Sequence, residues 1–166
     1  VLIWIGTRIY QSAPPYPSEI ILSTGKTLMR STDIQAGQNV WQTMGGMQLG
    51  SVWGHGSYVA PDWTADWLHR ESMFLLNAWA RKDFSKTYAD LDNERQAQLQ
   101  SRLEKTMRTN TYDAVSGKLT LDALRGEAFE DNLKHYAAVF TEGNKDYAIP
   151  AGAQSDPERL RSLASF

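Results

Sequence analysis

Residues 61–81 read PDWTADWLHRESMFLLNAWAR, and this stretch decides the fold class. Its bulky apolar side chains recur every three to four residues, as they do on one face of an α-helix. The stripe consists of Trp63, Trp67, Phe74 and Ala78, with Leu68, Leu75 and Trp79 beside it. Asp66, His69, Arg70 and Asn77 lie mostly on the opposite face. Because Pro61-Asp62 supplies a start signal, the pattern predicts a long amphipathic helix from there to about Arg81.

A second helix is predicted on the N-terminal side of this one. Thr32-Asp33-Ile34-Gln35 has the spacing of a capping box, with threonine at the cap and glutamine three residues later. The apolar face that follows consists of Ile34, Gly37, Val40, Trp41 and Met44. The helix is expected to end at Gly45-Gly46, and the glycine-rich residues 45–60 are expected to form a compact loop without regular structure.

Three more helices are predicted towards the C-terminus. One starts at Asp90 or Asp92 and carries a narrow apolar stripe of Leu99, Leu103 and Met107. The next runs from Asp122 to near Gly143 with Phe129, Leu133, Tyr136, Ala137 and Phe140 on one face. The last begins at Ser155-Asp156-Pro157-Glu158, which is another capping box.

The predicted β structure is small. Residues 19–30 contain two short apolar runs around Gly25, which is typical of a hairpin. Residues 109–120 favour a turn and a short strand. We therefore expect a mainly α domain with a small added β-hairpin and strand portion.

Composition excludes several classes of function. The chain has 166 residues, a formal net charge of −2 and no cysteine. Without cysteine there can be no disulfide, thiolate zinc site, iron–sulfur cluster, cysteine nucleophile or covalently attached c-type haem. The near-balanced charge argues against nucleic-acid binding. Six tryptophans, five of them between Trp41 and Trp79, indicate an aromatic-rich core or interface.

The short motifs leave two alternative functions open, a ligand-binding module and a metal-dependent enzyme. His55, His69 and His135 lack the spacing of a zinc pair, and His69-Arg70-Glu71 cannot converge on one atom of a substrate from a single helix. Gly54-His55-Gly56-Ser57-Tyr58 offers backbone carbonyls that suit calcium but no carboxylate, and a tight turn beneath tryptophans is the simpler interpretation. One alternative is a stand-alone periplasmic module that binds a small apolar ligand, and the other is a metal-dependent enzyme that uses His55 and His69.

The two ends of the sequence are apolar or amphipathic. Val1-Leu2-Ile3-Trp4-Ile5 is expected to be either the last turns of a transmembrane helix or a buried strand. Residues 11–18 hold three prolines and predict an extended connector. The helix that begins near Pro157 is expected to continue beyond Phe166.

Three runs in near-fixed order carry a resemblance to a known family. These are residues 37–41 (GQNVW), residues 50–58 (GSVWGHGSY) and residues 60–71 (APDWTADWLHRE). Residues 107–113 and 163–166 are similar as well. The chain resembles the N-terminal hydrophilic domain of quinol-dependent nitric oxide reductases of bacteria.

The resemblance implies a cytochrome c-like helical domain that has lost its haem. Relatives that use cytochrome c carry a Cys-x-x-Cys-His box, which falls here on Gly46, Leu49 and Gly50. Thioether attachment and histidine ligation would both be impossible at these positions. The space of the haem would be filled by Trp41, Trp53, Trp63 and Trp67 together with Met44 or Met47.

The resemblance also implies a setting and partners. The whole enzyme would reduce two NO to N2O and water with electrons from quinol, using haem b groups and a non-haem iron in the membrane domain of the same polypeptide. This chain would then contain no catalytic residue and no cofactor of its own. Gly56 and Tyr58 would contribute to a calcium site only together with the membrane domain. The domain would face the periplasm or extracellular side of the bacterial inner membrane.

The expected division of the chain follows from the same resemblance. Residues 1–10 would end a transmembrane helix, and residues 11–31 would form the linker and hairpin. Residues 32–154 would form the cytochrome c-like domain. Residues 155–166 would start the helix that leads to the next transmembrane segment.

Overall fold

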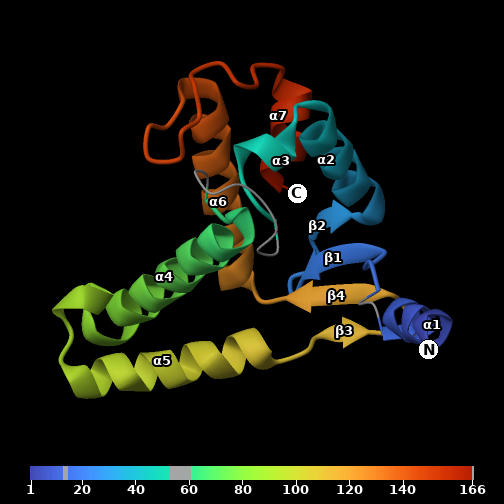
Figure 1. Ribbon diagram of the computed structural model, residues 1–166. Coiled ribbons are helices and arrows are strands. Elements are labelled where there is room, and N and C mark those ends of the chain that lie inside the picture. Colours follow the sequence, from blue (N-terminus) through green and yellow to red (C-terminus); the bar gives the residue numbers. More distant parts are fainter. Residues whose placement is uncertain (13–14, 53–60, 166) are drawn as a thin grey trace.

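The computed structural model describes residues 1–12, 15–52 and 61–165, and it is mainly helical with one small sheet (Figure 1). The helices are α1 (Leu2–Ser12), α2 (Ser31–Thr43), α3 (Gly46–Leu49), α4 (Trp63–Phe84), α5 (Asn93–Arg108), α6 (Ala123–Glu142) and α7 (Pro157–Ser165), with a 3-10 turn, η1 (Tyr88–Asp90). The strands are β1 (Glu19–Leu22), β2 (Thr27–Arg30), β3 (Tyr112–Asp113) and β4 (Lys118–Leu121). The predicted mainly α class with a small β portion is confirmed.

Aspartate side chains cap the N-termini of the three longest helices. The carboxylates of Asp62, Asp92 and Asp122 accept hydrogen bonds from backbone N–H groups three residues later, at 3.0, 2.9 and 2.8 Å. Each bond satisfies one of the N–H groups that has no partner within its helix. The predicted starts of α4 and α6 are confirmed, and α5 starts after Asp92 rather than Asp90.

Two predicted caps are wrong in detail. α2 begins at Ser31, before Thr32, because the carboxylate of Asp33 accepts from the backbone N–H of Arg30 at 2.8 Å. At α7 the capping side chain is that of Asp156 rather than Ser155, and it accepts from the N–H groups of the second and third following residues. At α7 an aspartate has taken the role expected of a hydroxyl, whereas at α2 Asp33 has taken the role expected of Gln35, three residues after the cap.

The predicted loop over residues 45–60 is also partly wrong, because it contains the short helix α3. Gly45 has a φ of 74°, a left-handed conformation that ends α2 and turns the chain into α3. The remainder of that loop, residues 53–60, lies outside the described residues.

The sheet joins segments about one hundred residues apart. Its strand order is β2-β1-β4-β3, with β1 parallel to β4 and the other two pairs antiparallel. The β1–β2 pair is the predicted hairpin, whose pairing shifts between Ile20 and Ile21. Parallel pairing places Ile20 opposite Leu119, which ties the hairpin to the chain just before α6.

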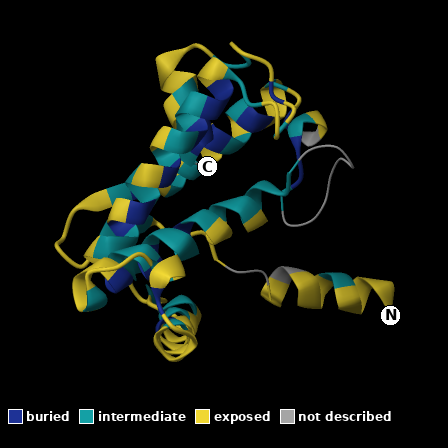
Figure 2. Cartoon of the chain, turned by 90° about the vertical axis from the view of Figure 1, so that its left-hand side faces the viewer, coloured by how far each residue is buried: buried dark blue, intermediate teal, exposed yellow. Residues whose placement is uncertain are grey.

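The buried side chains form two separate clusters along α4. The first core lies where α2, α6 and α7 meet the start of α4, and its buried members are Trp41, Tyr136, Val139, Phe140, Ile149, Leu163 and Ala164. The second core lies between the later part of α4 and α5, and its buried members are Leu75, Leu76, Trp79, Ala80, Leu91 and Leu99. Figure 2 shows dark blue buried positions recurring along the helices of the domain.

The N-terminal segment is helical, so the alternative of a buried strand for Val1–Ile5 is wrong. Its apolar side chains are exposed: 85% for Leu2, 87% for Ile3 and 66% for Trp4 (Figure 2). Among the described residues, no helix combines the length and the apolar character needed to cross a membrane.

Candidate functional site

Trp63 is the hub of an aromatic cluster at the first turn of α4. Its ring centroid lies 6.2 Å from that of Trp41, 5.9 Å from Tyr136 and 5.4 Å from Tyr147, each in an edge-to-face arrangement. Phe140 lies at 5.6 Å with a tilted ring. Edge-to-face and offset arrangements are those that the ring quadrupoles favour.

Trp67 extends this cluster by one helical turn. Its ring stacks on Tyr136 with a centroid distance of 5.6 Å and an angle of 10° between the planes. The period of α4 places positions 63 and 67 on one face, and the period of α6 does the same for positions 136 and 140. We call Trp41, Trp63, Trp67, Tyr136, Phe140 and Tyr147 the aromatic cluster.

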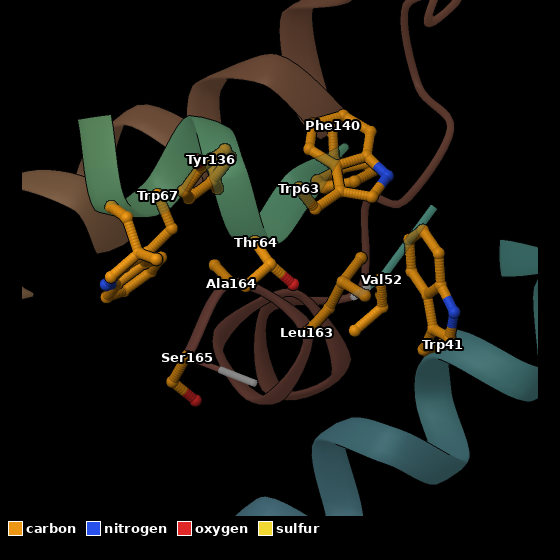
Figure 3. A pocket seen from close by; sticks show the side chains of 11 residues that line it. Trp41, Val52, Trp63, Thr64, Trp67, Tyr136, Phe140, Leu163, Ala164 and Ser165 are labelled. Carbon is orange, nitrogen blue, oxygen red and sulfur yellow. The ribbon is translucent and has the colours of Figure 1, made fainter. Parts of the chain in front are cut away.

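A cavity of about 280 Å³ lies against the cluster (Figure 3). Its lining is mostly apolar and comes from α2, α4, α6 and α7 and from the chain at Val52. In Figure 3, Trp41 and Trp67 stand at opposite ends of the cavity, with Leu163 and Ala164 of α7 between them. Thr64 of α4 and Ser165 of α7 bring hydroxyl groups to the lining.

Gly46 and Gly50 lie directly against the tryptophans. A Cβ atom at Gly46 would overlap the indole ring of Trp41, and one at Gly50 would overlap the indole Nε1 of Trp63 and lie 2.7 Å from the carbonyl oxygen of Pro61. Leu49, between them, is half-buried against the first core. The three positions that the resemblance identified therefore lie beside the rings of Trp41 and Trp63. Positions 46 and 50 have no room for a side chain.

Backbone hydrogen bonds hold this glycine segment against α4. The N–H of Ser51 donates to the carbonyl of Pro61 at 3.0 Å, and the N–H of Trp63 donates to the carbonyl of Ser51 at 2.8 Å. The Ser51 hydroxyl also donates to a carboxylate oxygen of Asp62 at 3.1 Å. These contacts set the close approach that leaves only glycine at position 50.

Asp66 forms the polar part of the site. Its carboxylate accepts a hydrogen bond from the Tyr136 hydroxyl at 2.7 Å and one from the Tyr147 hydroxyl at 3.0 Å. Burial, reinforced by the hydrogen bond to Asp66, raises the pKa of Tyr136 far above its ordinary value, and the same causes raise the pKa of Tyr147. Both phenols therefore stay protonated at neutral pH.

His135 borders these tyrosines without joining their hydrogen bonds. Its ring lies 5.1 Å from that of Tyr136 and 6.1 Å from that of Tyr147, both edge to face. Burial, followed by the positive charge of Arg70, lowers the pKa of His135 below its ordinary value. The imidazole is therefore neutral at pH 7, and its Nε2 has no hydrogen-bond partner among the described residues.

The other candidates from the sequence do not assemble into a site. His69 is exposed, whereas Glu71 is buried and accepts from the Nε of Arg125 at 2.6 Å, so the predicted failure of His69-Arg70-Glu71 to converge is confirmed. Within the described ranges, no three histidine or acidic side chains gather closely enough to hold a metal ion. His55, Gly56 and Tyr58 lie outside the described residues, as does Trp53.

The structure describes four of the side chains that the resemblance implies as fillers of the haem space. Trp41, Trp63 and Trp67 all line the cavity, and Met44 packs against the first core. The side chain of Met47 is not among those described.

The Asp66 network was not predicted. The sequence indicated the polar face of a helix for Asp66, whereas the structure shows it half-buried beneath two tyrosines. The available signal was Tyr136, because a phenol on an apolar stripe requires a hydrogen-bond acceptor. That signal does not say which residue provides the acceptor.

Comparison with known families identifies the chain. The family described as the NorB cytochrome c-like domain of nitric oxide reductase matches residues 17–166. A search of curated proteins finds no significant match. Because the family match covers nearly the whole sequence, the chain belongs to the NorB cytochrome c-like domain family of nitric oxide reductases.

Proposed function

We propose, from this membership, that the chain is a haem-free structural domain of a quinol-dependent nitric oxide reductase. The observation that carries the proposal is the packing of Trp41 against Gly46 and of Trp63 against Gly50. Relatives that bind haem c would need a cysteine and the ligating histidine at these two glycines. The residues present here do not fit that cofactor.

The residue types and the packing at Gly46 and Gly50 each support the proposed loss of haem binding. The sequence contains no cysteine, so no thioether can form, and Gly50 offers no imidazole to the iron. A side chain at either glycine would overlap an indole ring. An unfilled haem space would destabilise a small domain, because cavities cost about 24 cal/mol per Å³. The tryptophan rings reduce that cost by occupying space with apolar atoms.

The proposed role is to cap the membrane domain of the same polypeptide on its periplasmic or extracellular side, at the bacterial inner membrane. That membrane domain would hold the haem b groups and non-haem iron that reduce two NO to N2O and water, with quinol as electron donor. This chain would contribute no catalytic residue. Gly56 and Tyr58 would help to hold calcium only in contact with the membrane domain.

The ends of the chain are consistent with this arrangement. The exposed apolar side chains of α1 favour residues 1–10 as the end of a transmembrane helix, followed by the linker and hairpin at residues 11–31. Residues 32–154 would form the haem-free cytochrome c-like domain. Residues 155–166 would begin the helix that leads to the next transmembrane segment.

Haem titration tests the proposal directly. We expect no Soret band characteristic of ligated haem when haem is added to the chain. We also expect none from the variant Gly46→Cys/Leu49→Cys/Gly50→His expressed with haem-attachment machinery, because Trp41 and Trp63 occupy the required space. The matched control adds Trp41→Ala and Trp63→Ala to this triple variant, which removes both obstacles. A covalent haem in the triple variant alone would contradict the proposed steric exclusion.

Function in the whole enzyme needs a separate measurement. We expect the full-length protein in membranes to consume NO when supplied with quinol and to be insensitive to added cytochrome c. Dependence on cytochrome c would overturn the proposed class of reductase.

The cavity favours a second candidate, a module that binds a small apolar ligand. Its volume of about 280 Å³ is close to the lower end of the range for ligand pockets, and its lining is rich in aromatic side chains. Micromolar binding of a small apolar molecule, lost in Ala164→Phe, would support this candidate. The metal-dependent alternative has no support from His69, because the described residues place no group of three histidine or acidic side chains around it.

A further inference from the structure

We propose that the aromatic cluster conducts one-electron oxidation from Trp41 through Trp63 to the two tyrosines that share Asp66, where the carboxylate takes the phenolic proton. This activity is distinct from the proposed function and does not depend on it. It would move an oxidising equivalent out of the buried core to a half-exposed tyrosine.

The ring contacts provide a continuous route. Trp41 and Trp63 are separated by 6.2 Å between centroids, and Trp63 is 5.9 Å from Tyr136 and 5.4 Å from Tyr147. Every one of these side chains can lose one electron, unlike Phe140, which lies beside the route. No step requires more than direct contact between neighbouring rings.

The proton acceptor is what distinguishes this cluster from an ordinary aromatic core. An oxidised phenol is a strong acid, so tyrosine is oxidised readily only when a base within hydrogen-bond reach takes its proton. Asp66 lies 2.7 Å from the Tyr136 oxygen and 3.0 Å from the Tyr147 oxygen. A single carboxylate thus serves both phenols.

The step balances with a one-electron oxidant of the strength of the nitrogen dioxide radical. The oxidant gains one electron and is reduced, to nitrite in the case of nitrogen dioxide. The electron comes from Trp41 and is replaced through Trp63 by one from a tyrosine. The phenolic O–H bond breaks, its proton forms a new O–H bond on Asp66, and a neutral phenoxyl radical remains.

The two ends of the route differ in burial. Trp41 is 7% exposed and Tyr136 is 5% exposed, whereas Tyr147 is half-buried on a loop after α6. The raised pKa values of both tyrosines keep their protons in place until oxidation occurs, so electron loss and proton transfer are coupled. Tyr147 is therefore the member of the aromatic cluster at which an external reductant could reduce the phenoxyl radical.

The absence of cysteine allows a clean photochemical test. A single Gln42→Cys substitution on the exposed side of α2 places a ruthenium photosensitiser next to Trp41. After flash oxidation we expect a tyrosyl radical, identified by its visible absorption and electron paramagnetic resonance spectrum. Its formation should be slower in D2O than in H2O. A rate that is the same in both solvents would overturn the coupled proton transfer.

Conservative variants test each part of the route. Trp63→Phe keeps a packed ring but removes the relay, and it should abolish the tyrosyl signal while Trp41 is still oxidised. Asp66→Asn should slow tyrosyl formation by about a hundredfold, since it removes the base but keeps an acceptor oxygen. Tyr136→Phe/Tyr147→Phe should eliminate the signal.

Tyr88→Phe is the matched control, because Tyr88 packs on the second core and lies outside the aromatic cluster. It should leave the tyrosyl yield unchanged. A tyrosyl signal that survives in Tyr136→Phe/Tyr147→Phe, or that is unaffected by Trp63→Phe, would overturn the proposed route. Circular dichroism of each variant verifies that it is folded, and the isotope measurement needs no variant in the cluster.

Discussion

At the scale of single residues, glycines 46 and 50 set the shape of the site. A methyl group at either position would collide with an indole ring. The Trp63 ring contacts four other rings of the aromatic cluster, and the Trp41 ring contacts Trp63 and is buried in the first core. A close-packed core does not yield easily to added atoms. The absence of two side chains is therefore as important here as the presence of two tryptophans.

We expect Gly50→Ala to destabilise the chain by about 1–3 kcal/mol, the usual cost of overpacking. The added methyl group would displace Trp63 or the carbonyl of Pro61. Urea denaturation followed by circular dichroism measures the change. Gly6→Ala is the control, because a Cβ there meets no atom within 4 Å, and it should be neutral or slightly stabilising. An unchanged midpoint for Gly50→Ala would contradict the described packing.

The tyrosines that share Asp66 predict a loss of stability at alkaline pH. Their pKa values are raised in the folded chain above the ordinary value of about 10, so the unfolded chain loses these protons first as the pH rises. The stabilisation is therefore complete below about pH 10 and is lost progressively above it. Denaturation between pH 8 and pH 11 measures this loss. In Tyr136→Phe/Tyr147→Phe we expect a less stable chain with a weaker dependence on pH.

His135 predicts a loss of stability at acidic pH. Because its pKa is lowered in the folded chain, the unfolded chain binds this proton first as the pH falls below about 6.5. The contribution of a neutral His135 is therefore present above that pH and is lost on acidification. Comparison of His135→Gln with the parent chain between pH 4 and pH 8 measures it. The parent should lose more stability than the variant over this range.

At the scale of elements, α4 connects the two cores. Its first turns supply Trp63 and Trp67 to the first core, and its later turns supply Leu75 and Trp79 to the second. Between them Glu71 is 6% exposed and pairs with Arg125 of α6 at 2.6 Å. The pair fixes how α4 lies against α6.

We expect Arg125→Leu to cost about 3 kcal/mol or more, because it leaves the buried Glu71 carboxylate without its partner. The double variant Glu71→Leu/Arg125→Leu should regain most of this loss, since two apolar side chains need no ion pair. Thermal unfolding of the two single variants and the double variant completes the cycle. Additive losses would mean that the two side chains do not stabilise each other.

The helix α5 is held through its narrow apolar stripe, in which Leu99 is 2% exposed. We expect Leu99→Ala to destabilise the chain by about 2–5 kcal/mol, since it leaves a cavity in the second core. Gln98→Ala, one position away on the exposed side, should have little effect. Denaturant unfolding distinguishes the two variants, and equal effects would contradict the assigned face of α5.

At the scale of the whole molecule, the first core is completed by residues from opposite ends of the sequence. Trp41 of α2 and Leu163 of α7 are both buried in it, 122 positions apart. The sheet likewise joins the hairpin to a distant part of the sequence. Glu19 of β1 lies opposite Lys118 of β4, and their side chains form an ion pair at 3.0 Å. Long-range contacts of this kind hold the helices in one arrangement.

Local patterns in the sequence determined most of the secondary structure. Apolar stripes and aspartate caps located α4, α5 and α6, because helical period and N-terminal capping depend only on nearby residues. Gly25 and its flanking apolar runs likewise determined the β1–β2 hairpin. The shifted caps of α2 and α7 show the limit of such rules, since several polar side chains near a helix start compete for the same N–H groups.

The family was also accessible from the sequence, and the resemblance predicts Gly46, Leu49 and Gly50 as the positions of a lost haem attachment. Residues 37–41, 50–58 and 60–71 carried that resemblance, and the family match over residues 17–166 confirms the family. The sequence does not indicate whether positions 46 and 50 could accept a side chain, because the answer depends on where Trp41 and Trp63 lie.

Only the tertiary structure brought Asp66 to Tyr136 and Tyr147, and only it joined β1 to β4. The physical reason is the same in both cases. Helical and strand periods state which face of an element is apolar, but they contain no information on which distant face will cover it. That choice is made when the two cores and the sheet pack together, and the site formed by α4, α6 and the loop after α6 is its consequence.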